Sequence, residues 1–579
     1  MAEWIPAARS IDPHVHATWA RLWASLSPES MGSAWLDWAA HLATSPGKRL
    51  DLLHLASEQA NQLAMYLAQT WGMGPAGPRA PVEPPAQDRR FADPAWQRWP
   101  FNLLHQSFLL QQQWWEAATA DVWGVEKHHR DVTAFGARQW LDLLSPGNLL
   151  WTNPVALERT LREGGANLQR GFMYFLDDLS RAWSGRPPAG AENFVVGRDV
   201  AVTPGKVVLR NRLIELIQYA PTTPSVHPEP VLIVPAWIMK YYILDLSPHN
   251  SLIRYLVSQG HTVFCISWKN PTAEDRDLGM QDYLDLGVRA ALAAVNAIVP
   301  GRKVHATGYC LGGTLLAIAA AAMVRDGDER LATMTLFAAQ TDFSEPGELG
   351  LFIDESEISL LEAQMAETGY LRADQMAGAF QMLRSYDLLY SRMVNEYLLG
   401  ERRPMNDLMA WNADATRMPA RMHSEYLRQL FLENALSEGH FNVDGRPVSL
   451  VDVEWPTFMV GTLTDHVAPW RSVYKLHLLS PAEITFALTS GGHNAGIVSE
   501  PGHPRRSYRL RTRPANGTYL SPDEWLATTE ERPGSWWPAW TDWLRAHSGT
   551  PGVAPPPLGA PEQGYPALAD APGQYVRER

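Results

Sequence analysis

The stretch KVHATGYCLGGTLLAIAAAAM, residues 303–323, determines which fold this sequence predicts. A short run of β-forming residues leads into the turn Gly308-Tyr309-Cys310-Leu311-Gly312, and an Ala- and Leu-rich helical segment follows. The two glycines allow a sharp strand-to-helix turn that presents the central side chain at the carboxyl edge of a sheet. The pattern therefore predicts a nucleophile elbow with Cys310 at the position where serine is usual.

The alternative for Cys310 is a buried structural cysteine, because cysteine is often part of a core. The strand, the two glycines and the helix around it favour a nucleophile instead. The start of the following helix stabilises a thiolate, and the Leu311 N–H can donate to a developing oxyanion. The only other cysteine, Cys265, lies in an alternating apolar run and is expected in the core.

Short β-rich runs alternate with helical stretches after about residue 195, a pattern typical of βαβ units and a buried, mainly parallel sheet. The expected strands are PVLIVPAW (230–237), HTVFCISW (261–268), KVHATGYC (303–310), LATMTLFAA (331–339), PTFMVGTL (456–463) and EITFALTSG (483–491). This alternation places the chain in the α/β class.

A nucleophile elbow predicts an acid and then a histidine, each following a later strand. Asp465 follows one expected strand and His493 follows the next. The order Cys, Asp, His is that of the α/β-hydrolase fold. His466 is a competing histidine, but it stands beside Asp465 and not in the histidine position. The second oxyanion donor is expected in the loop after the strand at 230–237, from Ile238 or Trp237.

A cysteine nucleophile is informative about the substrate. A thiolate that attacks a thioester forms another thioester of nearly equal energy, so an acyl group can be loaded and passed on. A serine would form a more stable oxyester. Cys310 therefore indicates acyl transfer from a thioester such as an acyl-CoA, although a hydrolase can also use cysteine.

Three regions are expected along the chain. Residues 1–195 form a mostly helical N-terminal domain, with a Pro- and Gly-rich linker or arm at 72–96. Residues 196–550 form the α/β-hydrolase catalytic domain, with a helical cap inserted at about 343–445. Residues 551–579 form a Pro/Gly-rich C-terminal tail that is extended along a surface or partly disordered.

Composition excludes several other classes. The formal net charge of −13 argues against nucleic acid as a partner. Two cysteines in 579 residues form neither a disulfide framework nor a four-thiolate zinc site, which favours the reducing cytoplasm. The start lacks the pattern of a signal peptide, and the longest apolar run is far shorter than the roughly 20 residues of a transmembrane helix. Many of the 24 Trp residues are expected in the core, and some at an amphiphilic surface.

The chain resembles the polyhydroxyalkanoate synthases, the bacterial poly(3-hydroxybutyrate) polymerases. The resemblance runs from about residue 140 to the last residue and is loose before residue 130. It rests on NPVALERTLREGGANLQRGFMYFLDDL (153–179), VLIVPAWIMKYYILDLSPHNSLIRYLVSQGHTVFCISWKNP (231–271), GYCLGGT (308–314), DHVAPW (465–470), SGGHNAGIV (490–498), GSWWPAWTDWL (534–544) and APGQYVRER (571–579). The length fits the single-subunit type.

This resemblance implies that Cys310 carries the growing polyester and that His493 is its base. Asp465 supports His493 or activates the 3-hydroxyl of the incoming monomer, and the sequence leaves both roles open. The resemblance also implies 3-hydroxyacyl-CoA as substrate, release of CoA, no cofactor beyond that CoA thioester, an active homodimer, and residence on polyester granules in the cytoplasm. His423 in the expected cap, where short-chain members carry a different motif, leaves the monomer length open.

Two other functions fit parts of the sequence. A dienelactone-hydrolase-like or thioesterase-type cysteine hydrolase can share the G-Y-C-x-G-G elbow, but dienelactone hydrolases are far shorter and lack the Trp-rich N-terminal region. A catalytically weak granule-associated protein would not need Cys310, Asp465 and His493 in their expected positions.

Overall fold

The computed structural model describes residues 27–71, 80–84, 88–376, 378 and 389–579, which divide into two compact units. One unit, the catalytic unit, contains Gly190–Met376 and Met405–Arg579. The other, the helical unit, contains the described residues up to Ala189 together with those of Ala377–Pro404. The first part of the expected N-terminal domain, residues 72–79 and 85–87 of the expected arm and a short stretch of the expected cap lie outside the described residues.

The catalytic unit is built on an eleven-stranded sheet in the order β14-β13-β12-β11-β6-β5-β3-β4-β2-β1-β15. Its six central neighbours, β12, β11, β6, β5, β3 and β4, are parallel, and the outer strands are antiparallel. The strands are β1 Gly205–Arg210, β2 Ile214–Tyr219, β3 Val231–Val234, β4 Val263–Trp268, β5 Val304–Tyr309, β6 Leu331–Phe337, β11 Thr457–Thr462, β12 Ile484–Thr489, β13 Ser507–Arg513, β14 Glu531–Pro533 and β15 Ala569–Asp570. All six strands expected from the sequence are confirmed, and the fold is that of an α/β hydrolase.

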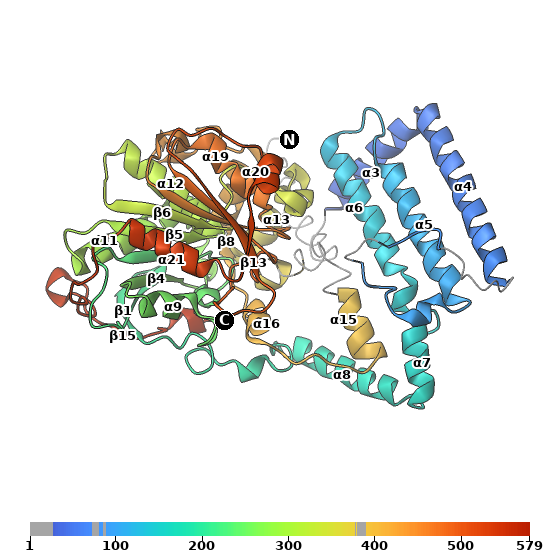
Figure 1. The fold of residues 1–579 in the computed structure, drawn as a ribbon, viewed down its shortest axis with the longest axis horizontal. Coiled ribbons are helices and arrows are strands. Elements are labelled where there is room, and N and C mark those ends of the chain that lie inside the picture. The colour runs from blue at the N-terminus through green and yellow to red at the C-terminus, as the bar shows by residue number, and fades with distance from the viewer. Residues whose placement is uncertain (1–26, 72–79, 85–87, 377, 379–388) are drawn as a thin grey trace, which may run out of the picture. The chain divides into compact units, whose positions relative to one another are not determined.

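Helices cover both faces of this sheet (Figure 1). Leu232 and Val234 of β3 pack in one core with α11 and α12, whereas Val231 and Ile233 pack in the other core with α9 and α21. This alternation follows from the two-residue period of a strand. The helices of this unit are α9 Leu252–Ser258, α10 Met280–Asp282, α11 Ala290–Ile298, α12 Leu311–Arg325, α13 Glu355–Thr368, α16 Asp407–Asn412, α17 Ala420–Glu425, α18 Trp470–Tyr474, α19 Leu476–Leu479, α20 Pro522–Thr528 and α21 Trp537–Ala546.

The segment between β6 and β11, where the cap was expected, is only partly a compact insertion. Within the catalytic unit it contributes α13, α16 and α17, and α17 continues through wider helical turns at Tyr426–Leu432. Short strands β7 (Tyr370–Leu371) and β8 (Met418–Pro419) pair with each other, as do β9 (Asn442–Val443) and β10 (Arg446–Pro447). The part from residue 377 to 404 belongs to the helical unit instead.

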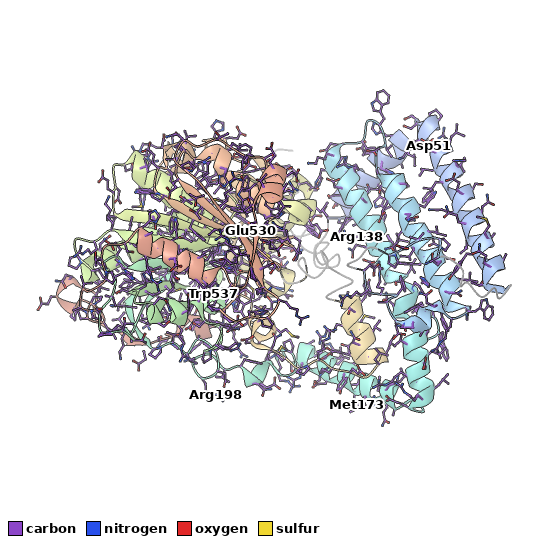
Figure 2. All side chains as sticks on the ribbon, in the orientation of Figure 1. Asp51, Arg138, Met173, Arg198, Glu530 and Trp537 are labelled. Atoms are coloured by element: carbon purple, nitrogen blue, oxygen red, sulfur yellow. The ribbon has the colours of Figure 1, made fainter. Side chains whose placement is uncertain are left out.

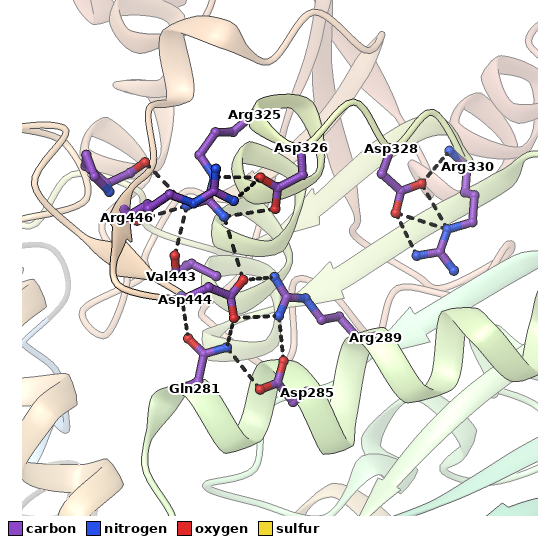
Figure 3. Close-up of polar contacts among 11 residues, drawn as sticks. Gln281, Asp285, Arg289, Arg325, Asp326, Asp328, Arg330, Val443, Asp444 and Arg446 are labelled. Atoms are coloured by element: carbon purple, nitrogen blue, oxygen red, sulfur yellow. Dashed lines mark hydrogen bonds and ion pairs between the residues drawn. The ribbon is translucent and has the colours of Figure 1, made fainter.

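Within the catalytic unit, an ionic network holds the β9–β10 hairpin against neighbouring helices (Figure 3). Arg289 Nη2 lies 2.6 Å from Asp444 Oδ2 in the hairpin, and Arg446 Nη2 lies 2.6 Å from Asp326 Oδ1, just beyond α12. Arg325, at the end of α12, contributes a further guanidinium between Asp326 and Asp444. Isolated surface ion pairs stabilise little, but here three arginines share neighbouring carboxylates. The network therefore ties the end of the cap segment to the helix that follows the elbow.

The Pro/Gly-rich tail runs along the outer strands of the sheet. Its strand β15 pairs with β1, with Lys206 opposite Asp570. Beyond it, the backbone N–H groups of Gln574 and Tyr575 both donate to Glu215 Oε2, at 2.8 and 3.0 Å. This pairing explains how a segment with little hydrophobic periodicity is ordered.

The helical unit contains antiparallel neighbours α3 to α6, followed by α7, α8 and the short α15. Their bounds are α3 Pro28–Ala43, α4 Pro46–Trp71, α5 Phe101–Thr119, α6 Lys127–Leu143, α7 Pro154–Arg162, α8 Ala166–Trp183 and α15 Ser391–Met393. A small core of Val82, Phe91, Trp96, Phe108, Leu109, Leu110 and Leu141 joins α5, α6 and the segment before α5. None of the helices in the described residues is long and apolar enough to cross a membrane.

Helix α8 packs its polar face against the segment 389–404. A Cβ at Gly171 would lie 2.0 Å from Tyr397 O, so the two backbones meet directly. Arg402 binds two neighbouring carboxylates of α8, with Nη1 2.9 Å from Asp177 Oδ2 and Nη2 2.7 Å from Asp178 Oδ1. A piece of the expected cap is therefore fastened to a helix more than 200 residues earlier in the chain.

The tryptophans divide between core and surface. Trp536, Trp537 and Trp540 around α21 are fully buried, and Figure 2 labels Trp537 there. By contrast, Trp123, Trp151 and Trp183 of the helical unit are more than three-quarters exposed. The core expectation for Trp is thus confirmed, whereas the amphiphilic surface stays a prediction.

Candidate active site

Cys310 lies between β5 and α12 with a φ of +52°, a conformation that non-glycine residues rarely adopt. Its N–H donates to Phe337 O of β6 at 2.9 Å, and its carbonyl accepts from Gly313 N at 2.9 Å. The neighbouring strand and the first turn of the helix thus hold the strained residue in place. The geometry is that of the expected nucleophile elbow.

Close backbone approaches explain the elbow glycines. A Cβ at Gly312 would lie 2.1 Å from Val234 O, and a Cβ at Gly308 would lie 2.3 Å from the Gly313 Cα. Real Cβ atoms do not approach other atoms so closely, so only glycine fits at either position. The end of β3 therefore packs directly on the start of α12.

Asp465 is held by several donors in the loop that follows β11. His493 Nδ1 lies 2.8 Å from Asp465 Oδ2, which also accepts from Thr462 Oγ1 at 2.7 Å. Its other oxygen, Oδ1, accepts from the N–H groups of Val467 and Ala468, each at 2.9 Å. The carboxylate side chain is completely buried, so these donors replace water around it.

Opposing effects set the charges of this pair. Burial alone would lower the pKa of His493, but the Asp465 carboxylate, the Cys310 sulfur and hydrogen bonds to both raise the pKa well above its usual value. Burial alone would raise the pKa of Asp465, but His493 and the donors from Ala468 and Thr462 lower it. The surroundings of His493 therefore favour its protonated imidazole.

Sequence reasoning missed three residues around this triad. The Tyr309 ring stacks on the His493 ring, with centroids 5.7 Å apart, and its hydroxyl donates to Asn494 Oδ1 at 2.7 Å. Tyr426, from the turns after α17, is buried, and burial together with the charge of Cys310 raises the pKa of its phenol. Tyr309 and Asn494 are sequence neighbours of predicted site residues, and that adjacency was the available signal.

The two predicted oxyanion donors lie on segments that touch. Leu311 is the first residue of α12, where backbone N–H groups have no partner within the helix. Ile238 lies in the loop after β3, and Pro235 of that loop would be 2.4 Å from a Cβ at Gly312. The structure thus brings the loop of Ile238 to the start of the elbow helix, and the role of each N–H stays a prediction.

The remaining sequence-predicted residues have simple positions. Cys265 is fully buried in β4, and burial raises the pKa of its thiol, which confirms the expected core role. The histidine bonded to Asp465 is His493. Among the described residues, no cluster of three or more His, Cys, Asp or Glu side chains is arranged to hold a metal ion.

Family models match most of the chain. A model described as "Poly-beta-hydroxybutyrate polymerase (PhaC) N-terminus" matches residues 87–256, and "Poly-beta-hydroxybutyrate polymerase N terminal" matches residues 6–48. The "alpha/beta hydrolase fold" model matches residues 229–500, in agreement with the sheet order described above.

Relatives with long alignments carry one name. The poly(3-hydroxyalkanoate) polymerase of Methylorubrum extorquens is 44% identical over 504 residues, which cover 86% of this chain and 82% of that protein. The corresponding polymerase subunit of Cupriavidus necator is 35% identical over 577 residues, which cover 98% and 95% of the two chains. Identity at this level over nearly the full length of both chains shows the family. The chain belongs to the poly(3-hydroxyalkanoate) polymerase family.

Proposed function

We propose that this protein is an acyltransferase that polymerises 3-hydroxyacyl-CoA monomers into a polyester and releases CoA. The observation that carries the proposal is the position of His493, which is bonded to Asp465 on one side and interacts with Cys310 on the other. The names of its relatives support the product class. No cofactor is needed, because the CoA thioester is the substrate and supplies the activated acyl group.

The first step is acylation of Cys310. The Cys310 sulfur attacks the thioester carbonyl, so a new sulfur–carbon bond forms and the bond to the CoA sulfur breaks. His493, which holds the proton given up by the Cys310 thiol, donates it to the departing CoA thiolate. The Leu311 and Ile238 N–H groups would donate to the oxyanion between these two events.

The second step lengthens the chain. The 3-hydroxyl of an incoming monomer attacks the thioester held on Cys310, His493 accepts the hydroxyl proton, and the Cys310 thiolate departs. The extended chain, now a CoA thioester, acylates Cys310 again and CoA is released. Thioester exchange keeps each loading of Cys310 close to isoenergetic, whereas each elongation converts a thioester into a more stable oxyester and is therefore favourable.

The hydrogen bonds of Asp465 support one of its two possible roles. Its oxygens accept from His493, Thr462 and two backbone N–H groups, and its side chain is completely buried. A carboxylate so occupied favours orientation of the His493 imidazole over direct contact with a monomer hydroxyl.

The activity is tested with purified protein and 3-hydroxyacyl-CoA of four, eight and ten carbons, following free CoA and insoluble polyester. We expect CoA release coupled to polymer with at least one chain length, and neither product from Cys310→Ser. CoA release without polymer would identify a thioesterase-type hydrolase. No release from any substrate would refute the catalytic proposal, as expected for a catalytically weak granule-associated protein.

We also propose that α8 contacts the hydrophobic surface of the polyester granule in the cytoplasm. The polar face of this helix meets the segment 389–404, whereas Phe172, Met173 and Leu176 on its other side are exposed (Figure 2 labels Met173). An exposed apolar patch of this kind typically marks a contact with an apolar partner. An apolar patch of this kind can also form a subunit interface, as in the homodimer that the family resemblance implies.

Partitioning onto preformed polyester particles tests this surface. The triple change of Phe172, Met173 and Leu176 to Ser should release most of the protein into the supernatant. Leu50→Ser with Leu53→Ser removes leucines of α4 that are even more exposed, and this pair is the control. Unchanged partitioning with loss of a dimer in mass photometry would assign α8 to the subunit interface instead.

A further inference from the structure

A lysine is buried in the loop that follows β3. Lys240 is only 7% exposed, its Nζ lies 2.9 Å from Asp414 Oδ1, and it donates to Glu578 O at 2.8 Å. Burial lowers the pKa of Lys240, and the Asp414 carboxylate opposes that effect. A buried cation is costly unless it is paired, so its partners must be held in place.

The backbone around Lys240 is fixed by the segment 411–416. Thr416 Oγ1 lies 2.7 and 2.5 Å from the carbonyl oxygens of Trp237 and Ile238, and its one hydroxyl hydrogen is shared between them. Trp411 Nε1 donates to Lys240 O at 2.7 Å, and Met239 forms an antiparallel bridge with Ala415. Every carbonyl from residue 237 to 240 except that of Met239 thus has a side-chain donor from this segment.

These contacts determine where the Ile238 N–H points. The Trp237 carbonyl and the Ile238 N–H belong to one planar trans peptide unit and point in opposite directions. Because Thr416 holds the carbonyl from one side, the N–H is directed to the other side. The direction of the N–H therefore depends on the distance between the loop and the segment 411–416.

The C-terminal segment also bonds to the loop of Lys240 and to the residues beside the segment 411–416. Glu578 Oε2 accepts from Asn270 N at 3.0 Å, and the Asn270 side chain accepts from Arg417 N at 3.0 Å. Arg417 Nη2 in turn donates to Arg579 O at 3.1 Å. Lys240 is bonded to both Asp414 and Glu578, so it joins all three segments.

We propose that Lys240 is a positioning residue for the oxyanion donor, binding the loop of Ile238 to the segment 411–417 and to the C-terminal segment. This inference rests on the proposed acyl transfer. Without the ammonium group, Asp414 and Glu578 O lose their shared donor. The loop of Ile238 can then move away from the segment 411–417 and from the C-terminal segment. A shift of about 1 Å at a catalytic group lowers rates about 100-fold.

Two reactions of Cys310 distinguish a role in positioning the oxyanion donor from general disruption of the active site. Acylation by a 3-hydroxyacyl-CoA passes through an oxyanion, whereas alkylation by iodoacetamide is a displacement at saturated carbon and forms none. For Lys240→Met we expect single-turnover CoA release to fall about 10- to 100-fold. Alkylation of Cys310 should change by less than about 2-fold, and kcat should fall more than KM rises, because the oxyanion forms only after substrate binds.

The matched control is Lys206→Met, since Lys206 is a more exposed lysine that pairs with Asp570 of the same C-terminal region. In this variant, the rates of acylation and of alkylation of Cys310 should equal those of the unchanged protein. Lys240→Arg should restore part of the acylation rate, and Asp414→Asn should reproduce the selective loss.

Two results would overturn the inference. An unchanged acylation rate in Lys240→Met would show that the bonds of Lys240 are not needed to position the loop of Ile238. An equal fall in the rates of acylation and alkylation would show general disruption of the site. If the unchanged protein released no CoA from any 3-hydroxyacyl-CoA, the proposed function would fail first, and this inference with it.

Discussion

The phenol of Tyr309 stacks on the imidazole of His493, with ring planes inclined by 29° and centroids 5.7 Å apart. The tyrosine directly precedes Cys310, and its hydroxyl is bonded to Asn494, the residue after the histidine. His493 is therefore held by Asp465 through a hydrogen bond and by Tyr309 through its ring face. The elbow that presents the sulfur also supports the base.

Tyr309→Phe keeps the ring contact and removes the bond to Asn494. We expect kcat to fall about 5-fold, in line with the loss of roughly 1 kcal/mol from one hydrogen bond. Tyr309→Leu, which also removes the ring, should lower kcat further and shift the pH–rate profile of acylation. Equal activity of all three proteins would show that Asp465 alone orients His493.

The two cysteines should respond differently to substitution. Cys310→Ser should lose nearly all turnover, because a serine hydroxyl is a poorer nucleophile in this site and its oxyester is harder to transfer. Cys265→Ala should keep most of it, since the Cys265 side chain is fully buried in β4. CoA release by each variant is the measurement, and an inactive Cys265→Ala protein of normal stability would contradict our choice of nucleophile.

Asp465→Asn should lower the rate of CoA release by roughly 10²- to 10⁴-fold. The amide cannot accept all four of the present donors, so the orientation of His493 is lost. Both the first acylation and chain elongation should slow, as measured in single-turnover and steady-state assays. Normal acylation with blocked elongation would instead assign Asp465 to the monomer hydroxyl.

Gly312→Ala tests the contact between β3 and the elbow helix. The new Cβ would lie 2.1 Å from Val234 O, so the strand and the helix must separate. We expect a loss of about 1–3 kcal/mol in the free energy of unfolding, together with nearly all activity. Gly47→Ala in α4 is the control, because nothing lies within 4 Å of its added methyl group. Urea unfolding and CoA release would measure both effects.

Stability should fall with acidity through the buried histidines. Burial, followed by the charges of His227 and His305, lowers the pKa of His261 to about 3, against about 6.5 in an unfolded chain. The unfolded state therefore binds more protons between these values. The stabilising contribution of neutral His261 is complete above about pH 6.5 and is lost as the pH falls toward 3.

The His261→Phe variant tests this dependence. Its unfolding free energy should vary with pH less steeply than that of the unchanged protein between pH 6 and pH 4, by up to about 1.4 kcal/mol per pH unit. Urea unfolding at a series of pH values measures the slope, and identical slopes for His261→Phe and the unchanged protein would refute the assignment.

The parallel centre of the sheet was predictable because its strands are buried on both faces and read as continuous apolar runs. The outer strands were not. Strand β13 has the sequence SYRLRTR, with three arginines. Strand β2 carries the buried polar residues Glu215 and Gln218, which bond to the C-terminal segment, and Glu215 also pairs with Arg210 of β1. Their polar character hides their position in the sheet.

The cap illustrates the same limit. Its helical character was evident from the sequence, but the attachment of the segment 389–404 to α8 depends on Arg402 meeting Asp177 and Asp178. Nothing local in either segment indicates the other. Long-range ion pairs leave no periodicity in a sequence.

The nucleophile elbow, the order Cys310, Asp465, His493 and the α/β architecture follow from the amino-acid sequence, because glycine spacing, strand hydrophobicity and chain order are local properties. The three-dimensional fold was needed to show how His493 is held between Asp465 and Tyr309, and how Lys240 joins the Ile238 loop to residues 414 and 578. Those contacts join segments far apart in the chain, which come together only when the sheet, the segment before β11 and the C-terminal segment pack against one another.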